Sequence, residues 1–184
     1  MKVNIIGCGG VGSNLAYFLS RNPDVDELVL VDNDIVESKN LSRQFFTKED
    51  IGRPKVDALG DLIQKFNPDI RVSRLNMKVD ETTVYGIDNS ALTILATDGI
   101  RSKKILAERC KNIYIANCDK GEFEVKPELD HRDLCAWEIA NGYNTSEQDF
   151  LSNMLASAEI YKQICLKMKK VMKYHIDSEK QRGV

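Results

Sequence analysis

Glycines near the start of the chain are spaced as in a turn that binds nucleotide phosphates. Gly7, Gly9 and Gly12 form a Gly-x-Gly-x-x-Gly pattern, and Gly10 is a further glycine inside it. In such a turn the first glycine permits a sharp bend, the second lets phosphate oxygens approach the backbone, and the third lets the next helix pack closely. The N–H groups that begin this helix favour phosphate. The pattern therefore predicts nucleotide binding.

An acidic residue follows at the distance that such a site needs. Asp32 lies about 20 residues beyond the turn, where a carboxylate accepts hydrogen bonds from ribose hydroxyls. Asp34, two residues later, is also expected to contact the nucleotide. The alternatives are a glycine turn that binds nothing and an Asp32 that only caps a surface turn.

The polar loop after Asp32 favours ATP over NAD. Asn40, Arg43, Gln44 and Lys55 follow in order, and an NAD site would need only the acid. Arg offers a planar fork and Lys a point charge to phosphate oxygens, which suits a triphosphate. Asp98 follows a predicted strand and is expected to reach the phosphates through Mg²⁺. Taken singly, each of these loop residues can also be an ordinary solvated side chain.

The surrounding pattern supplies the elements that must position these residues. Short apolar runs predict buried strands, and amphipathic spacing predicts helices. We expect strands at 3–6, 27–31, 71–75, 92–96 and 113–116, and helices at 13–20, 55–66 and 101–109, with a short helical turn at 48–51.

The last third of the sequence is less regular. Residues 121–129 suggest an antiparallel strand, residues 131–142 stay unassigned, and residues 146–172 predict a long helix. Its apolar positions include Phe150, Met154, Ala158, Ile160, Ile164, Leu166 and Met168. The whole predicts an α/β fold: a Rossmann-like, doubly wound, mainly parallel sheet with a short antiparallel C-terminal part and a long C-terminal helix. We expect one domain over residues 1–177 and a flexible tail over 178–184.

Composition narrows the function classes. The chain has 184 residues, 42% of them hydrophobic and 29% charged, and a formal net charge of −2, which gives no sign of nucleic-acid or membrane binding. Its five cysteines include no Cys-x-x-Cys pair, which speaks against a disulfide framework and a structural zinc site. No targeting or membrane-spanning segment is visible, so we expect a cytoplasmic protein.

Four segments together resemble the ubiquitin-activating-enzyme superfamily, which includes the bacterial ThiF, MoeB and HesA adenylyltransferases. The segments are GCGGVGS (7–13), VDNDIVESKNLSRQFF (31–46), IGRPKVDAL (51–59) and ATDGIRSKKIL (96–106). The resemblance covers roughly residues 1–120. It implies a mainly parallel sheet, ATP bound at the glycine turn, and adenylation of the C-terminal carboxylate of a small ubiquitin-like or sulfur-carrier protein or a peptide. Pyrophosphate is the second product.

Residue roles follow from the same resemblance. It implies that Asp32 binds the ribose, that Asn40, Arg43, Gln44 and Lys55 surround the phosphates, and that Asp98 binds Mg²⁺. It also implies a homodimer or a heterodimer. The sequence departs from the family in four features. Gly99 stands where Asn is common, and zinc-binding Cys-x-x-Cys pairs are missing. The region after Lys120 does not match the usual crossover loop, and the chain begins at the first strand. We therefore expect the arginine that an N-terminal helix supplies in several members to be absent or to come from elsewhere.

Some members of this superfamily pass the activated carboxylate to a cysteine. Cys135 is the candidate nucleophile here, because neighbouring His131 and Arg132 can lower a thiol pKa. A buried structural thiol is the competing interpretation, and Cys118 is a weaker candidate nucleophile.

Three functions remain open from the sequence: an adenylyltransferase, a degenerate member that binds a nucleotide or carrier and works with a partner subunit, and an NAD-dependent oxidoreductase. The oxidoreductase leaves Arg43, Lys55 and Asp98 without a role and leaves little chain for a substrate domain.

Overall fold

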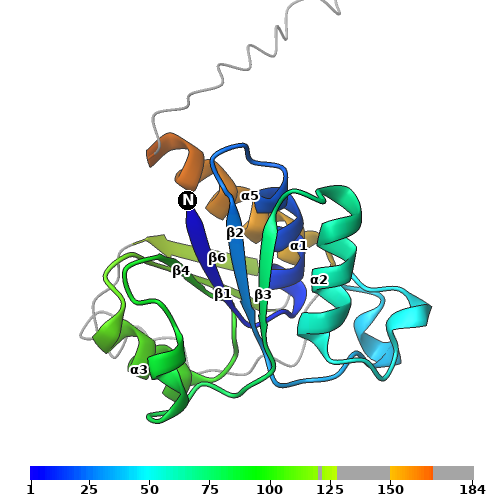
Figure 1. Cartoon of the computed structure of the whole chain (residues 1–184), viewed down its shortest axis with the longest axis horizontal. Coiled ribbons are helices and arrows are strands. Elements are labelled where there is room, and N and C mark those ends of the chain that lie inside the picture. Colours follow the sequence, from blue (N-terminus) through cyan, green and yellow to red (C-terminus); the bar gives the residue numbers. More distant parts are fainter. Residues whose placement is uncertain (120–121, 128–149, 168–184) are drawn as a thin grey trace, which may run out of the picture.

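A six-stranded sheet forms the centre of the molecule (Figure 1). The computed structural model describes residues 1–119, 122–127 and 150–167. The strands are β1 (Lys2–Ile6), β2 (Glu27–Val31), β3 (Arg71–Leu75), β4 (Leu92–Leu95), β5 (Ile113–Asp119) and β6 (Glu122–Pro127). The helices are α1 (Gly10–Ser20), α2 (Lys55–Phe66), α3 (Ile100–Arg109) and α5 (Phe150–Lys167), with short 3-10 turns η1 (Ser38–Asn40), η2 (Lys48–Asp50) and η3 (Thr83–Gly86).

The strand order is β3-β2-β1-β4-β5-β6, and β1 to β5 run parallel. β6 pairs antiparallel with β5. The order reverses between β1 and β4, and in a doubly wound sheet a ligand crevice opens beyond the strand ends at that point. The mainly parallel, Rossmann-like α/β fold predicted from the sequence is confirmed.

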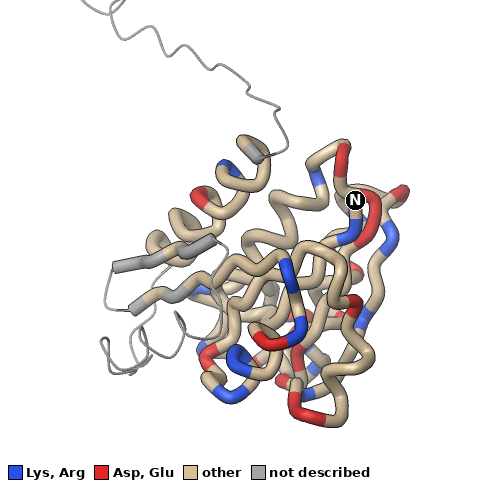
Figure 2. The backbone as a smooth tube through the Cα atoms, turned by 90° about the vertical axis from the view of Figure 1, so that its left-hand side faces the viewer, with Lys and Arg blue, Asp and Glu red and all other residues tan. Residues whose placement is uncertain are grey.

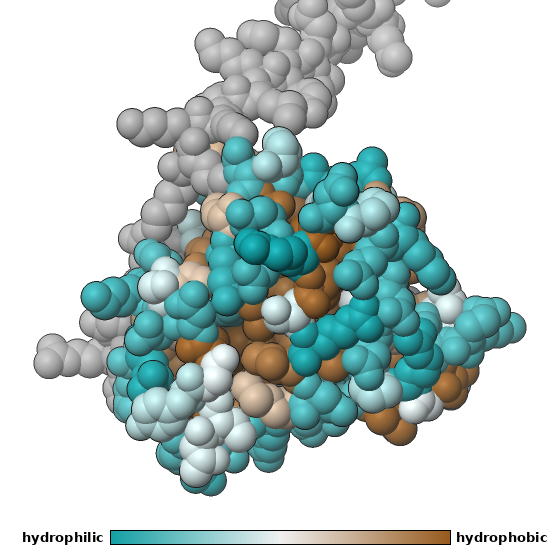
Figure 3. Space-filling view, viewed as in Figure 1, coloured by the Kyte–Doolittle hydropathy of each residue, from teal (hydrophilic) through white to brown (hydrophobic). Residues whose placement is uncertain are grey.

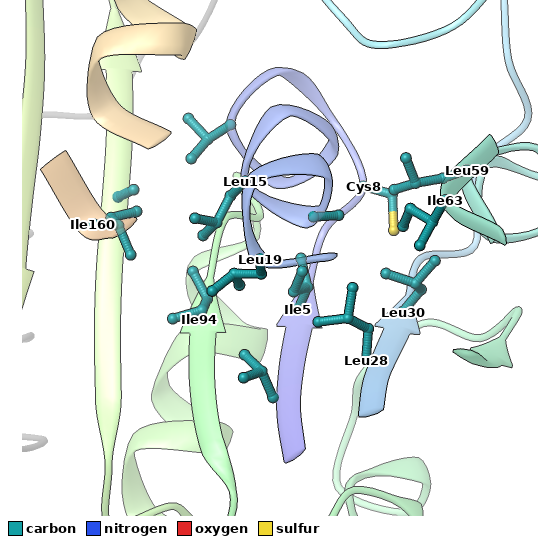
Figure 4. Packing of buried hydrophobic residues seen from close by; sticks show 14 of the residues in the cluster. Ile5, Cys8, Leu15, Leu19, Leu28, Leu30, Leu59, Ile63, Ile94 and Ile160 are labelled. Atoms are coloured by element: carbon teal, nitrogen blue, oxygen red, sulfur yellow. The ribbon is translucent and has the colours of Figure 1, made fainter. Parts of the chain in front are cut away.

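Helices cover both faces of this sheet, and the alternation of side chains along the strands builds a core on each side. Val3 and Ile5 of β1 belong to the core under α1, α2 and α5, whereas Ile6 belongs to the core under α3. Figure 4 shows the first core, where strand side chains point at the three helices. It contains Ile5, Leu28, Leu30, Ile94, Leu15, Leu19, Leu59, Ile63 and Ile160. Fully burying one such side chain contributes about 1.5–3 kcal/mol.

Several element boundaries differ from the sequence-based expectation. α1 begins at Gly10 and not at residue 13, because the last residues of the glycine turn already form the first helical turn, with the Ser13 N–H donating to the Gly9 carbonyl at 3.0 Å. β5 continues to Asp119 because its ladder with β6 runs that far. The turns η1 and η3 had no counterpart among the expected elements.

The buried face of α5 differs from the apolar positions chosen from the sequence. Small and polar side chains of α5 are buried together with Ile160 and Ile164, as α5 packs against α1. They are Ser152, Asn153, Ala156 and Ser157. Phe150, Ala158 and Leu166 are exposed. Small residues let the two helices approach closely, so the apolar pattern identified Ile160 and Ile164 but missed the small and polar residues that complete the buried face. The rest of the helix expected over 146–172 lies outside the described residues.

The surface is mixed in charge. Figure 2 shows basic and acidic residues interspersed along the described backbone, with no face of one sign in this view. Figure 3 shows polar side chains over most of a second face, with apolar side chains visible in its middle. None of the described helices is long and apolar enough to cross a bilayer.

Candidate functional site

A cavity of about 340 Å³ lies beyond the carboxyl ends of β1, β2 and β4. It occupies the place where the strand order reverses, as expected for a ligand site of this fold. Of the predicted site residues, eleven line this cavity: Gly7, Gly9, Gly10, Asp32, Asp34, Asn40, Arg43, Gln44, Lys55, Asp98 and the weaker candidate nucleophile Cys118. Gly12 does not line it, and Cys135 lies outside the described residues.

The glycine turn is held between β1, β4 and the start of α1. Gly7 has φ 95°, and a Cβ on it would lie 2.6 Å from the Ala96 carbonyl oxygen. A Cβ on Gly12 would lie 1.8 Å from the Gly7 carbonyl oxygen, so only glycine allows α1 to pack this close to the turn. Gly12 thus stands behind the cavity wall, in the packing role expected for the third glycine.

Two adjacent glycines of the turn have different surroundings. A Cβ on Gly9 would meet only the Gln44 Nε2 atom, at 3.7 Å, so nothing else nearby requires glycine there. The open side of Gly9 faces the cavity. A Cβ on Gly10 would lie 2.1 Å from Asn153 Nδ2 of α5. Gly9 therefore leaves room for a ligand, whereas Gly10 leaves room for a helix.

Asp32 links the turn to the loop that follows β2. Its carboxylate accepts hydrogen bonds from the Cys8 N–H at 2.7 Å and from the Asp34 N–H at 2.8 Å. A carboxylate has about four acceptor positions, so Asp32 can still accept hydrogen bonds from ribose hydroxyls. The Cys8 thiol is buried, and burial, followed by the charge of Asp32, raises its pKa well above the usual value. Cys8 is thus an inert small side chain.

Lys55 is fixed at the cavity by the same loop. Its Nζ atom lies 2.9 Å from Asp34 Oδ2, and its backbone N–H donates to the Asp34 carbonyl at 2.9 Å. Asn40 is buried in η1, where its Oδ1 accepts from the Glu37 N–H at 2.9 Å. The loop is therefore ordered by its own polar side chains.

Arg43 and Gln44 bring polar atoms that have no hydrogen-bond partner. Arg43 Nε and Gln44 Oε1 are both buried and unpaired within the described part of the chain. Buried polar atoms are normally paired, so two such atoms at one cavity are suited to a polar ligand. The Phe45 N–H donates to Ser13 Oγ at 3.0 Å, which ties this segment to α1.

Asp98 faces these cations from the end of β4. Its side chain lines the cavity, but partial burial among protein atoms raises its pKa. The positive charges of Lys103, Lys55 and Arg43 act in the opposite direction and lower this pKa. Lys103 was not identified from the sequence. It is fully buried in α3, and burial lowers its pKa to about 8 although Asp98 partly offsets this effect. In the sequence it is one of two adjacent lysines, and nothing local distinguishes it.

The carboxylates fit the way proteins usually hold Mg²⁺. The described residues contain no group of three His, Cys, Asp or Glu side chains that would cage a metal. Mg²⁺ is commonly held by one or two carboxylates together with substrate phosphates and water. Asp98, which lines the cavity together with Arg43 and Lys55, is a carboxylate that such a site could use.

The sequence is similar to known activating enzymes over its first two thirds. The model of the ThiF family matches residues 1–126. A protein named SAMP-activating enzyme E1 from Haloferax volcanii is 31% identical over 112 residues, which cover 60% of this chain and 41% of the relative. Ubiquitin-like modifier-activating enzyme 5 from Drosophila pseudoobscura pseudoobscura is 40% identical over 92 residues, covering 50% and 22%. The chain thus spans less than half the length of these relatives.

Solved structures share the fold. E. coli MccB with AMPCPP and MccA superposes with a TM-score of 0.75 at 22% identity, covering 92% of this chain and 56% of MccB. E. coli MccB with ATP gives a TM-score of 0.73 at 22% identity, covering 89% and 54%.

Proposed function

Because the chain belongs to the ThiF family, we propose that it is an ATP-dependent adenylyltransferase. Its acceptor would be the C-terminal carboxylate of a small ubiquitin-like or sulfur-carrier protein, or of a peptide, and pyrophosphate would be released. Relatives named as activating enzymes for SAMP and for a ubiquitin-like modifier support this class of reaction. A structural neighbour that binds ATP supports the cofactor.

The observation that carries the proposal is the arrangement of charges around the open side of Gly9. Arg43, Lys55 and Asp98 line the cavity together with Gly9, and the charges of Lys55 and Arg43 act on the Asp98 carboxyl group. Two cations next to a glycine turn and a helix N-terminus suit the negative charge of a triphosphate. An NAD site would need only the acid, so these cations favour ATP over NAD. Asp32, which lines the same cavity, would hold the ribose.

The reaction needs positioning and charge neutralisation more than acid–base chemistry. A carboxylate oxygen of the acceptor bonds to the α-phosphorus of ATP, the bond from that phosphorus to the bridging oxygen breaks, and pyrophosphate leaves with its electron pair. No proton is transferred, since the acceptor is already ionised. Arg43 and Lys55 lower the repulsion between acceptor and phosphates and stabilise the departing charge.

Asp98 is the proposed Mg²⁺ ligand. When bound, the metal would supply further charge neutralisation on the phosphates. Lys103 behind Asp98 keeps a positive charge close to this carboxyl group and so favours its ionised form. The function of these residues in the chain is therefore to hold the triphosphate, its metal and the acceptor in one geometry.

The test compares thermal stabilisation by Mg·ATP and by NAD. Wild type, Asp98→Ala and the control Asp69→Ala are melted with each ligand; Asp69 is an exposed aspartate away from this cavity. A ligand at about 100 times its Kd adds roughly 2.7 kcal/mol of stability. We expect Mg·ATP to stabilise wild type and Asp69→Ala, and to stabilise Asp98→Ala much less.

Pyrophosphate exchange then separates the remaining alternatives. Exchange in the presence of an acceptor supports the enzyme, whereas Mg·ATP binding without exchange for any acceptor indicates a member that only binds and works with a partner. Stabilisation by NAD alone would refute the proposal and return the chain to the oxidoreductases.

A further inference from the structure

We propose that Asn153 of α5 is a positioning residue that holds the backbone of Arg43 at the phosphate end of the cavity. The proposal rests on the nucleotide-binding function argued above. Asn153 does not line the cavity, so it would act through Arg43 and not by touching the nucleotide. It is far from Arg43 in the sequence, and only the packing of α5 brings the two together.

Asn153 lies against the start of α1. It is fully buried, and a Cβ added to Gly10 would come within 2.1 Å of its Nδ2, 2.4 Å of its Cγ and 2.6 Å of its Oδ1. All three atoms of the amide group therefore cover the place where a Gly10 side chain would be. This contact leaves the amide little freedom to move relative to the glycine turn.

From this position the Asn153 amide reaches the loop after β2 that carries Arg43. Asn153 Nδ2 donates a hydrogen bond to the Arg43 carbonyl oxygen at 3.3 Å. The Arg43 N–H itself donates to the Asn40 carbonyl at 3.1 Å. Arg43 is thus held on its N–H side by its own loop and on its carbonyl side by α5. Its guanidinium, with Nε unpaired, is left to the cavity.

Packing alone does not account for an amide at residue 153. Asn153 Oδ1 is buried without a hydrogen-bond partner within the described residues. A buried polar atom without a partner lowers stability, and an apolar side chain of similar size would avoid that loss. We therefore infer that the amide is required for its N–H donor, which binds the Arg43 carbonyl oxygen.

Ser157, one helical turn along α5, supplies a matched control. It is also fully buried, and its single O–H hydrogen lies between two acceptors, the Val11 carbonyl at 2.9 Å and the Asn153 carbonyl at 2.7 Å from Oγ. It anchors the same face of α5 to the same end of α1, but no hydrogen bond joins it to the loop. Ser157→Ala should lower stability without changing Arg43.

The experiment measures Mg·ATP affinity and limited trypsin cleavage of Asn153→Ala, Ser157→Ala and wild type. Trypsin cuts after Arg43, and the carbonyl it attacks there is the one that Asn153 binds. Cleavage after Lys48, in an exposed part of the same loop, is the internal standard. Loss of one hydrogen bond predicts a Kd for Mg·ATP about fivefold higher in Asn153→Ala. We also expect a clear rise in cleavage at Arg43 relative to Lys48.

The control decides the interpretation. In Ser157→Ala, the Kd for Mg·ATP and the ratio of cleavage at Arg43 to cleavage at Lys48 should stay near those of wild type, even if the melting temperature falls. An unchanged Kd in Asn153→Ala, or an equal change in Ser157→Ala, would overturn the proposal. If wild type binds no Mg·ATP, the proposed function fails instead, and the cleavage ratio still decides whether Asn153 holds Arg43.

Discussion

Lys55 and Asp34 form an ion pair at the wall of the cavity, with Nζ and Oδ2 2.9 Å apart. The side chain of Lys55 is only 8% exposed, whereas that of Asp34 is 60% exposed. The buried cation is therefore held at the cavity by an acid that water also reaches.

Lys55→Met should weaken Mg·ATP binding by roughly ten- to a hundredfold, since a hydrogen bond to a charged group contributes about 1.5–3 kcal/mol. Lys48→Met is the control, because Lys48 is exposed in η2 and does not line the cavity. Isothermal titration calorimetry measures both. Equal affinities of the two variants would show that Lys55 does not bind the phosphates.

Alanine at Gly9 and at Gly10 should have opposite consequences. Gly9→Ala meets only Gln44 Nε2, at 3.7 Å, so stability should change by less than about 0.5 kcal/mol while Mg·ATP binding falls sharply. Gly10→Ala is driven into Asn153 and should lose about 1–3 kcal/mol of stability. Urea unfolding and ligand titration separate the two effects.

The double variant Gly10→Ala/Asn153→Ala tests the cause of that loss. Removing the Asn153 amide makes room for the new methyl group, so part of the stability should return. A double variant that is as unstable as the sum of the single variants would mean that the clash lies elsewhere.

Lys103 should give the folding stability a rising pH dependence in mildly alkaline solution. Its pKa is about 8 in the folded chain and near 10.5 when exposed, so between these values the unfolded chain holds a proton that the folded chain has released. Stability therefore rises with pH across this window, by up to about 1.4 kcal/mol per pH unit. Below pH 8 the cost of burying the charge is present in full.

Lys103→Met removes this contribution. Urea unfolding at pH 8, 9 and 10 should show a wild type that gains stability relative to the variant as the pH rises. Parallel curves for the two proteins would contradict a lowered pKa at Lys103.

Ser13→Ala should loosen the loop that carries Arg43. It leaves the Phe45 N–H without its acceptor and is expected to cost about 1–2 kcal/mol. Ser20→Ala is the control, because Ser20 is equally buried in α1 but donates only to the Tyr17 carbonyl of its own helix. Hydrogen exchange at Phe45 should speed up in the first variant alone, and equal exchange in both would contradict this role of Ser13.

The amino-acid sequence was enough to predict the parallel sheet and the polar residues that line one cavity. Apolar runs and helical spacing depend only on neighbouring residues. From them the bounds of β1 to β4 and α2 were predicted nearly to the residue. The carboxyl ends of parallel strands meet at one edge, so Asp32 and Asp98 were predicted to lie at one site, and both line the cavity.

The contacts that hold these residues follow from the packing of segments that are distant in the sequence. Sequence pattern alone treats Gly9 and Gly10 alike, and both line the cavity, yet only a Cβ on Gly10 would collide with Asn153. It treats Lys103 and Lys104 alike, although Lys103 is fully buried. The physical reason is that burial and contact between distant segments depend on how whole helices pack. Arg43 and Asn153 are 110 residues apart and meet only because α5 lies across α1.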